Sequence, residues 1–264
     1  MQGRLTFLGT GTSMGVPTLG CHCRVCTSPN PRDRRLRPSV LLRWPAAEGK
    51  ERVVVIDTGP DFREQALRTG LKSVDAVLYT HSHADHILGL DDLRPLSFGS
   101  VRVGGPIPLY TSPETATVLE RVFDYHFSSK STYPTRARVA IQPLADRVRV
   151  HEVEFTSVPV KHGDIDIAGF RFGDAAYLTD VSEIPESSFA LLQGLETLVL
   201  PSLRHHPHPS HATVKQAVEW ALRIGARQTW LTHIAHELGH DETNRMLPPG
   251  VALAYDGLEL AVNL

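Results

Sequence analysis

This sequence has little cysteine and no long hydrophobic run. Its 264 residues contain three cysteines, and an odd number cannot form a self-contained disulfide framework, so a disulfide-stabilised secreted scaffold is excluded. No apolar stretch is long enough to cross a bilayer, and the N-terminus has no signal-peptide hydrophobic region. We therefore expect a cytoplasmic protein without a membrane partner.

A charge excess of either sign is also missing. The chain has 27 Lys and Arg against 29 Asp and Glu, which gives a formal net charge of −2 and an isoelectric point near 6.7. Proteins that bind nucleic acid usually carry a strong basic patch, so this balance favours a small substrate over a nucleic-acid partner. No linker or repeat divides the sequence, which predicts a single domain over residues 1–264. Whether the protein forms a homodimer stays open.

Histidine, by contrast, is concentrated in one short motif. His81-Ser-His-Ala-Asp-His86 contains three imidazoles and one carboxylate, directly after an apolar segment at residues 74–80 that we expect to be a buried strand. Side chains two apart in an extended segment point to the same side, so His81 and His83 can hold one cation. Asp85 and His86 lie where the chain turns into a helix and would face a neighbouring position. The motif predicts a site for two metal ions rather than a solvated histidine-rich loop.

Further candidate ligands follow predicted strands later in the chain. His162 ends an alternating segment and precedes a glycine, and Asp180 ends a short apolar segment, where a carboxylate can bridge two cations. Two histidines, His233 and His236, follow the predicted strand at residues 228–232. One of them can complete the dinuclear site, and the other can reach the cysteine-rich loop.

The cysteines all lie in Cys21-His-Cys-Arg-Val-Cys26. This C-x-C-x-x-C spacing predicts a structural zinc site in a loop near residues 20–27. Cys21, Cys23 and Cys26 supply three thiolates, so a tetrahedral site needs a fourth ligand from elsewhere, for which we expect a histidine. The alternative is three reduced cysteines without a metal.

Local signals predict several secondary-structure elements. Residues 39–43 and 52–56 are expected to be paired strands, joined by a turn around residues 46–49. Asp61 is expected to cap the helix that follows it, and Ser112, which precedes a proline, is expected to cap another.

Four histidines lie close together just before a predicted helix. His211 precedes the capping-box pattern Thr213-Val-Lys-Gln216, and the free N–H groups and positive dipole end of a helix N-terminus suit a phosphate oxygen. His211 is therefore the best candidate for a proton donor. The same role remains open to the three other histidines, His205, His206 and His208.

The H-x-H-x-D-H motif resembles the signature of the metallo-β-lactamase superfamily. That superfamily has an α/β fold, a four-layer αββα sandwich with a dinuclear metal site at one edge. Within it, the early G-C-x-C-x-x-C loop and the late T-H-I-x-H are similar to those of the PhnP-type cyclic phosphodiesterases, named for an enzyme that opens a ribosyl 1,2-cyclic phosphate. The resemblance runs over nearly the whole chain, from Gly9-Thr-Gly to Asp256-Gly.

This resemblance implies a role for each candidate residue. Asp180 would bridge two catalytic divalent ions, manganese or alternatively zinc, and Asp57 would orient the metal histidines, with a simple turn role as its alternative. The other implied ligands of the catalytic ions are His81, His83 and His162 for one ion and Asp85, His86 and His233 for the other. The implied ligands of the structural zinc are Cys21, Cys23, Cys26 and His236. His211 would be the active-site histidine outside the metal sphere.

The implied activity is hydrolysis of a small or cyclic phosphodiester by a water that the two metals activate, with Asp85 and His211 as catalytic residues. A thioester or lactone hydrolase is the first alternative, because the same ligands can activate water against a carbonyl carbon. A tRNA 3′-processing endonuclease is a second, disfavoured by the near-neutral charge and by the lack of a Gly/Pro-rich arm between residues 100 and 145. A catalytically silent, metal-stabilised interaction module is a third.

Overall fold

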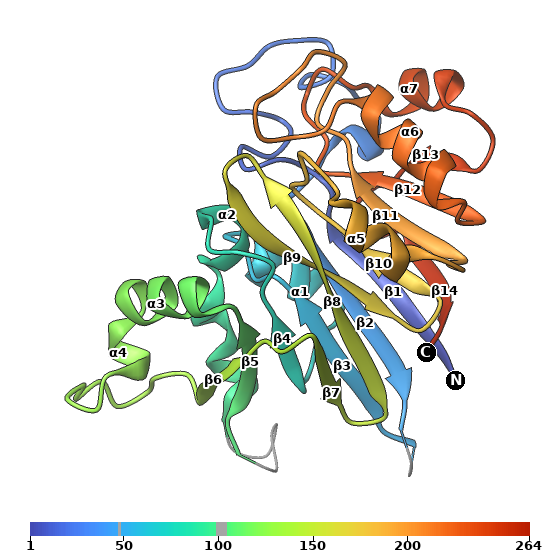
Figure 1. Ribbon diagram of the computed structural model, residues 1–264. Helices are drawn as coiled ribbons and strands as arrows, with labels where there is room; N and C mark the ends of the chain where they lie inside the picture. The colour runs from blue at the N-terminus through green and yellow to red at the C-terminus, as the bar shows by residue number, and fades with distance from the viewer. Residues whose placement is uncertain (47–48, 99–104) are drawn as a thin grey trace.

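The computed structural model describes residues 1–46, 49–98 and 105–264 (Figure 1). Within these residues, two seven-stranded β-sheets pack face to face, and helices lie on the outer face of each sheet. This arrangement confirms the predicted αββα sandwich. Part of the turn expected around residues 46–49, and the start of the segment 100–145, lie outside the described residues. None of the helices in the described ranges has the length and apolarity that crossing a membrane requires.

The first sheet has the strand order β14-β1-β2-β3-β4-β5-β6. It is antiparallel from β14 to β3 and parallel from β3 to β6. Its strands are β1 (Gln2–Gly9), β2 (Ser39–Pro45), β3 (Glu51–Ile56), β4 (Ala76–Leu78), β5 (Ile107–Thr111), β6 (Val139–Pro143) and β14 (Glu259–Asn263).

The second sheet has the order β13-β12-β11-β10-β9-β8-β7. It is parallel from β13 to β10 and antiparallel from β10 to β7. Its strands are β7 (Arg147–Val150), β8 (Val153–His162), β9 (Ile165–Phe172), β10 (Ala175–Tyr177), β11 (Thr197–Pro201), β12 (Gln228–Thr232) and β13 (Val251–Leu253).

Helices α1 and α3 pack on the outer face of the first sheet, and α5 and α6 pack on the outer face of the second. The α-helices are α1 (Phe62–Arg68), α2 (Ala84–Ile87), α3 (Pro113–Val122), α4 (Asp124–Phe127), α5 (Glu186–Phe189), α6 (Val214–Ile224) and α7 (His240–Met246). Short 3-10 helices lie at Pro31–Asp33, Leu90–Leu93, Pro95–Ser97 and Ala190–Leu192.

Strand β2 shows how the sequence builds a core on both faces of the first sheet. Val40, Leu42 and Trp44 point into the layer between the sheets, whereas Leu41 points toward the helices. Successive side chains of a strand point to opposite faces, so a strand that is buried on both faces reads as a continuous hydrophobic run. Each fully buried side chain of this kind contributes about 1.5–3 kcal/mol to the stability of the sandwich.

The helix starts predicted at Asp61, Ser112 and Thr213 are all confirmed, but the capping hydrogen bond expected of Asp61 is absent. The Ser112 Oγ accepts a hydrogen bond from the first turn of α3, and Thr213 and Gln216 form the predicted capping box at α6. Asp61 occupies the N-cap position of α1 but makes no side-chain capping hydrogen bond. Its carboxylate instead accepts from the Arg37 backbone N–H at 2.8 Å and from the Arg37 guanidinium at 2.9 Å. The Asp61 carboxylate therefore pairs with Arg37 and does not cap α1.

Strand ends from both sheets meet at one edge of the sandwich and place the predicted site residues there. His162 ends β8, Asp57 follows β3, and His233 follows β12, while His81 and Asp180 come shortly after β4 and β10. Asp57, Asp180 and His233 have positive φ angles of 65°, 58° and 54°. This left-handed conformation costs about 1–3 kcal/mol at a non-glycine residue and concentrates at functional sites. The left-handed backbone at these three residues therefore indicates that the functional site lies at this edge of the sandwich.

Candidate metal centre

The first group of predicted ligands contains three histidines. One ring nitrogen from each of His81, His83 and His162 lies within 4.8 Å of the others. The ring centroids of His81 and His83 are 4.5 Å apart, and those of His83 and His162 are 5.0 Å apart. His81 and His162 are buried, whereas His83 is exposed, so this side of the cluster is open to solvent.

The second group is fully buried and lies beside the first. It consists of Asp85, His86, Asp180 and His233, whose ligand atoms lie within 4.8 Å of one another. The two carboxylate oxygens of Asp180 face different partners: Oδ2 lies 3.2 Å from His86 Nε2, and Oδ1 lies 2.9 Å from His233 Nε2. Asp180 also lies within 4.8 Å of a ring nitrogen of His162, which belongs to the first group. Asp180 therefore stands between the two groups, where the sequence predicted a bridging carboxylate.

The buried acids and imidazoles stabilise each other's charged forms. Burial lowers the pKa of His86, but the carboxylates of Asp180, Asp57 and Asp85 outweigh it and raise this pKa well above its usual value. Burial raises the pKa of Asp180, but the imidazoles of His233 and His86 outweigh it and hold this pKa well below its usual value. An imidazole must be neutral to ligate a metal, so cation binding would displace protons from His86 and His233.

Several buried ring nitrogens have no hydrogen bond to satisfy them. The Nε2 atoms of His81, His86 and His233 make no well-directed hydrogen bond within the described residues. Buried polar atoms in proteins are normally paired, and a ring nitrogen that faces carboxylates without such a bond is suited to give its lone pair to a metal. The donor set of imidazole and carboxylate fits divalent zinc, manganese or iron.

Neighbouring groups fix the orientation of two of the histidines. The Asp57 Oδ2 lies 2.7 Å from His86 Nδ1, and the Ser210 carbonyl oxygen lies 2.7 Å from His162 Nδ1. These contacts place the proton on Nδ1 and leave Nε2 as the ligand atom. Thr80 donates to Asp57 through its N–H at 2.9 Å and its hydroxyl at 2.8 Å. The sequence interpretation missed Thr80 and Ser210, and adjacency in the chain to His81 and His211 is the only signal that pointed to them.

The cysteine loop meets a histidine from the other end of the chain. The Sγ atoms of Cys21, Cys23 and Cys26 lie 3.2, 3.3 and 3.6 Å from His236 Nδ1. His236 thus joins the cysteines and His233 joins the second ligand group, which resolves the choice that the sequence left open. The Cys26 N–H donates to Cys23 Sγ at 3.5 Å and lowers the pKa of Cys23 to about 6. This donor set, three sulfurs and one nitrogen, fits a tetrahedral zinc ion.

Of the four clustered histidines, His211 lies at the candidate centre. Its Nδ1 is 3.7 Å from Asp180 Oδ1, and its ring stacks on that of His233 at a centroid distance of 4.6 Å. Burial and the neighbouring imidazolium of His233 lower the pKa of His211 to about 3, so this ring is neutral. The other three histidines lie farther out in the same loop: His205 and His206 are exposed, and His208 is half-buried.

Two of the expected free donors at the N-terminus of α6 already have acceptors within the protein. The Val214 N–H donates to the Arg204 carbonyl at 3.0 Å, and the Gln216 N–H donates to Thr213 Oγ1 at 3.2 Å. These two N–H groups are therefore not free to receive a phosphate oxygen. His211 faces the candidate centre, and two donors of the helix end behind it are taken by the Arg204 carbonyl and by the capping box.

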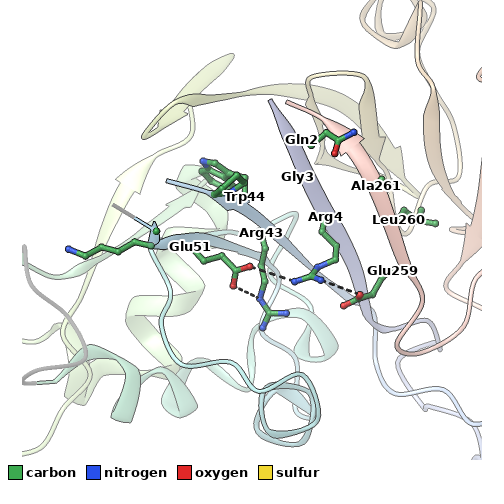
Figure 2. A pocket seen from close by; sticks show the side chains of 12 residues that line it. Gln2, Gly3, Arg4, Arg43, Trp44, Glu51, Glu259, Leu260 and Ala261 are labelled. Carbon is green, nitrogen blue, oxygen red and sulfur yellow. Dashed lines mark ion pairs between the residues drawn. The ribbon is translucent and has the colours of Figure 1, made fainter. Parts of the chain in front are cut away.

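A cavity of about 530 Å³ lies elsewhere, at the other end of β1 and β2 (Figure 2). Figure 2 shows Arg4 between Glu51 and Glu259, with N–O distances of 3.6 Å to each. Glu51 also lies 3.4 Å from Arg43. None of the predicted site residues is among those that line this cavity, and these acidic and basic side chains neutralise one another. The cavity therefore offers no group that the predicted chemistry requires.

The sandwich and the histidine–aspartate cluster at its edge define a hydrolase of the metallo-β-lactamase class. Residues 52–234 match the family described as the Beta-lactamase superfamily domain. A crystal structure described as a new diphosphatase from the PhnP family is 50% identical to this chain, with a TM-score of 0.93, and the match covers 100% of this chain and 98% of that one. The chain therefore belongs to the β-lactamase superfamily and, within it, to the PhnP family.

Two curated relatives carry other names. Octanoyltransferase of Porphyromonas gingivalis (strain ATCC BAA-308 / W83) is 36% identical over 264 residues, which cover 98% of this chain and 52% of that protein. The chain thus spans about half the length of the first curated relatives that it matches. Ribonuclease Z of Mycolicibacterium gilvum (strain PYR-GCK) is 28% identical over 234 residues, which cover 78% of this chain and 80% of that protein.

Proposed function

We propose that this chain is a metal-dependent phosphodiesterase that hydrolyses a small or cyclic phosphodiester at two adjacent divalent cations. The observation that carries the proposal is the position of Asp180, within 4.8 Å of ligand atoms from both groups. A carboxylate in such a position can bind two cations, one through each oxygen. His81, His83 and His162 would hold one cation, and the other would be held by Asp85, His86 and His233. Manganese or zinc suits these ligands, and zinc suits the separate cysteine site.

The protein's own side chains have distinct tasks in this reaction. Bound divalent cations would supply Lewis acidity that polarises the phosphoryl oxygen and makes the attacking water more acidic. Asp57 holds the His86 ring in place, and the Ser210 carbonyl holds the His162 ring. The neutral ring of His211 donates a hydrogen bond to the leaving oxygen and stabilises the negative charge that develops on it.

A diphosphate ester is a second candidate substrate, and one observation favours it. The PhnP-family structure that is 50% identical to this chain is described as a diphosphatase. Each phosphorus of a doubly substituted diphosphate carries two bridging oxygens, as the phosphorus of a phosphodiester does. The same site can therefore attack either compound, and the substrates differ only in whether the leaving oxygen belongs to an alcohol or to a second phosphate.

The remaining alternatives have less support. A thioester or lactone hydrolase would use the same activated water, and the octanoyltransferase name of one relative, a protein about twice the length of the match, makes a thioester worth assaying. A tRNA 3′-processing endonuclease binds a large polyanion, which the net charge of −2 does not attract. We therefore propose a small-molecule substrate.

The test is hydrolysis of four substrates by manganese-reconstituted protein. These are bis-p-nitrophenyl phosphate, a nucleoside diphosphate sugar, a thioester and a lactone. We expect turnover of a phosphoryl substrate, and we expect Asp180→Asn to reduce it by more than the about 10–100-fold typical of residues that only orient a ligand. Asp75→Asn, which removes a carboxylate that contacts His151 far from the cluster, is the matched control. Turnover of the carbonyl substrates alone would overturn the proposed reaction.

A further inference from the structure

One residue of the loop before α6 ties that loop to the candidate centre. The Ser210 carbonyl accepts from the Nδ1 of His162, a proposed metal ligand, at 2.7 Å. The N–H and the hydroxyl of Ser210 both lie 3.3 Å from the Nδ1 of His208. Arg204 holds the rest of the loop by donating to the carbonyls of His206 and Pro207 at 3.2 and 3.1 Å. The position of His208 is therefore fixed by the same residue that orients a ligand.

These contacts determine which nitrogen of His208 carries the proton. A backbone N–H can only donate, so Nδ1 of His208 is an acceptor, and in a neutral ring the proton must lie on Nε2. Burial and the positive charge of Arg204 lower the pKa of His208, which keeps the ring neutral. Within the described residues, the Nε2–H makes no hydrogen bond. His208 therefore presents an unused, oriented donor.

His208 contacts the ligand cluster through His211, which lies between them. The ring of His211 stacks on His233 at 4.6 Å, and the ring of His208 lies 4.9 Å from that of His211. A phosphorus attacked at the cluster would have its leaving oxygen near His211. The group attached beyond that oxygen would then lie beside His208. The exposed side chains of His205 and His206 make no ring contact with the cluster among the described residues.

We propose that His208 is a specificity-determining residue that donates its Nε2–H to the second phosphate of a diphosphate substrate. This inference rests on the proposed function in its diphosphate form. Water bonds to the phosphorus at the cluster, the bridging P–O bond breaks, and the leaving phosphate keeps the electron pair. The proton that the water loses passes to solvent. The added charge on the leaving phosphate faces His208. A phosphodiester with a single phosphorus has no anionic group at that place and gains nothing from this donor.

The test compares the binding of inorganic diphosphate and of orthophosphate to the metal-loaded protein by titration calorimetry. A hydrogen bond to a charged group that is lost from a built site costs about 10–100-fold in affinity. We expect His208→Ala to weaken diphosphate binding by about that factor while orthophosphate binding changes less than twofold. His208→Gln, whose amide NH₂ lies near the position of Nε2, keeps most of the diphosphate affinity. His206→Ala, in the same loop, is the matched control and leaves both affinities unchanged.

Hydrolysis assays separate this inference from the proposed function. If the wild type hydrolyses the diphosphate sugar, His208→Ala should lower kcat/KM for it by about 10–100-fold and leave bis-p-nitrophenyl phosphate turnover unchanged. Equal losses on both substrates, or no loss in His208→Ala, would overturn the role of His208 and leave the proposed function standing. If the wild type hydrolyses neither phosphoryl substrate, the proposed function fails, and the two binding affinities still decide whether His208 contacts a second phosphate.

Discussion

The substitution Asp57→Asn isolates what one buried carboxylate contributes to the candidate metal centre. Asp57 is completely buried and is surrounded by three donors. These are the Thr80 N–H at 2.9 Å, the Thr80 hydroxyl at 2.8 Å and the Nδ1–H of His86 at 2.7 Å. An asparagine keeps the size of the side chain but replaces one acceptor oxygen with an NH₂ donor. At least one of the surrounding donors then faces another donor.

The size of the effect follows from the place of His86. The charged acceptor at Nδ1 holds the ring so that Nε2 faces Asp85 and Asp180 at 3.3 and 3.2 Å. Removing such a partner from a metal-binding histidine costs about 10–100-fold in metal affinity, which equals about 1.4–2.7 kcal/mol. The unpaired buried donor also lowers the free energy of unfolding by about 1–3 kcal/mol. Affinity must therefore be measured where the variant is still folded.

The assay is a competition titration of metal-free protein with zinc or manganese against a chromophoric chelator, with circular dichroism to establish that each variant is folded. Asp75→Asn is the control, because Asp75 also accepts from a backbone N–H, at 2.8 Å, and contacts a histidine, at 2.9 Å, outside the candidate centre. We expect weaker binding only in Asp57→Asn. An unchanged affinity in Asp57→Asn, or an equal loss in Asp75→Asn, would refute the orienting role of Asp57.

Two further predictions concern the residues on either side of this centre. His211→Ala should keep the catalytic ions by elemental analysis but lose about 10²–10³-fold in kcat, as expected for a hydrogen-bond donor to the developing charge that is not a ligand, with His206→Ala unchanged; unchanged turnover would remove His211 from the mechanism. Cys23→Ser should lose the zinc of the cysteine loop and melt at least about 5 °C lower, because structural zinc contributes directly to folding. His22 is an exposed neighbour in the same loop, and His22→Ala should keep both the zinc and the melting temperature. A Cys23→Ser protein that keeps its zinc and an unchanged melting temperature would contradict the zinc site.

The sequence by itself determined the features that depend on neighbours in the chain. His81 and His83 share a side because an extended segment has a period of two. Thr213 and Gln216 form their capping box because the donors and acceptors involved lie within one helical turn. The three consecutive apolar residues Val40, Leu41 and Leu42 indicate a strand that is buried on both faces. Local geometry and side-chain period are sufficient for such predictions.

Only the tertiary structure determines which hydrogen-bond partner a group takes when that partner lies in another segment of the chain. Asp61 was expected to cap α1, but Arg37, brought beside it by the fold, takes its carboxylate. The Val214 N–H at the start of α6 was expected to be free, but the Arg204 carbonyl accepts its hydrogen bond. Neither partner is fixed by local pattern, because each comes from a separate segment whose position depends on how the chain packs.

The two late histidines, His233 and His236, show the same difference between what the sequence determines and what the fold determines. The sequence placed His233 and His236 after one strand and required that one reach the cysteines, but it could not say which. The left-handed backbone at His233 and the position of β12 in the second sheet direct His233 to Asp180 and His236 to Cys21. The strand order of the sheet and the backbone conformation of His233 determine which histidine joins which site. Neither can be predicted from the spacing of hydrophobic residues in the sequence.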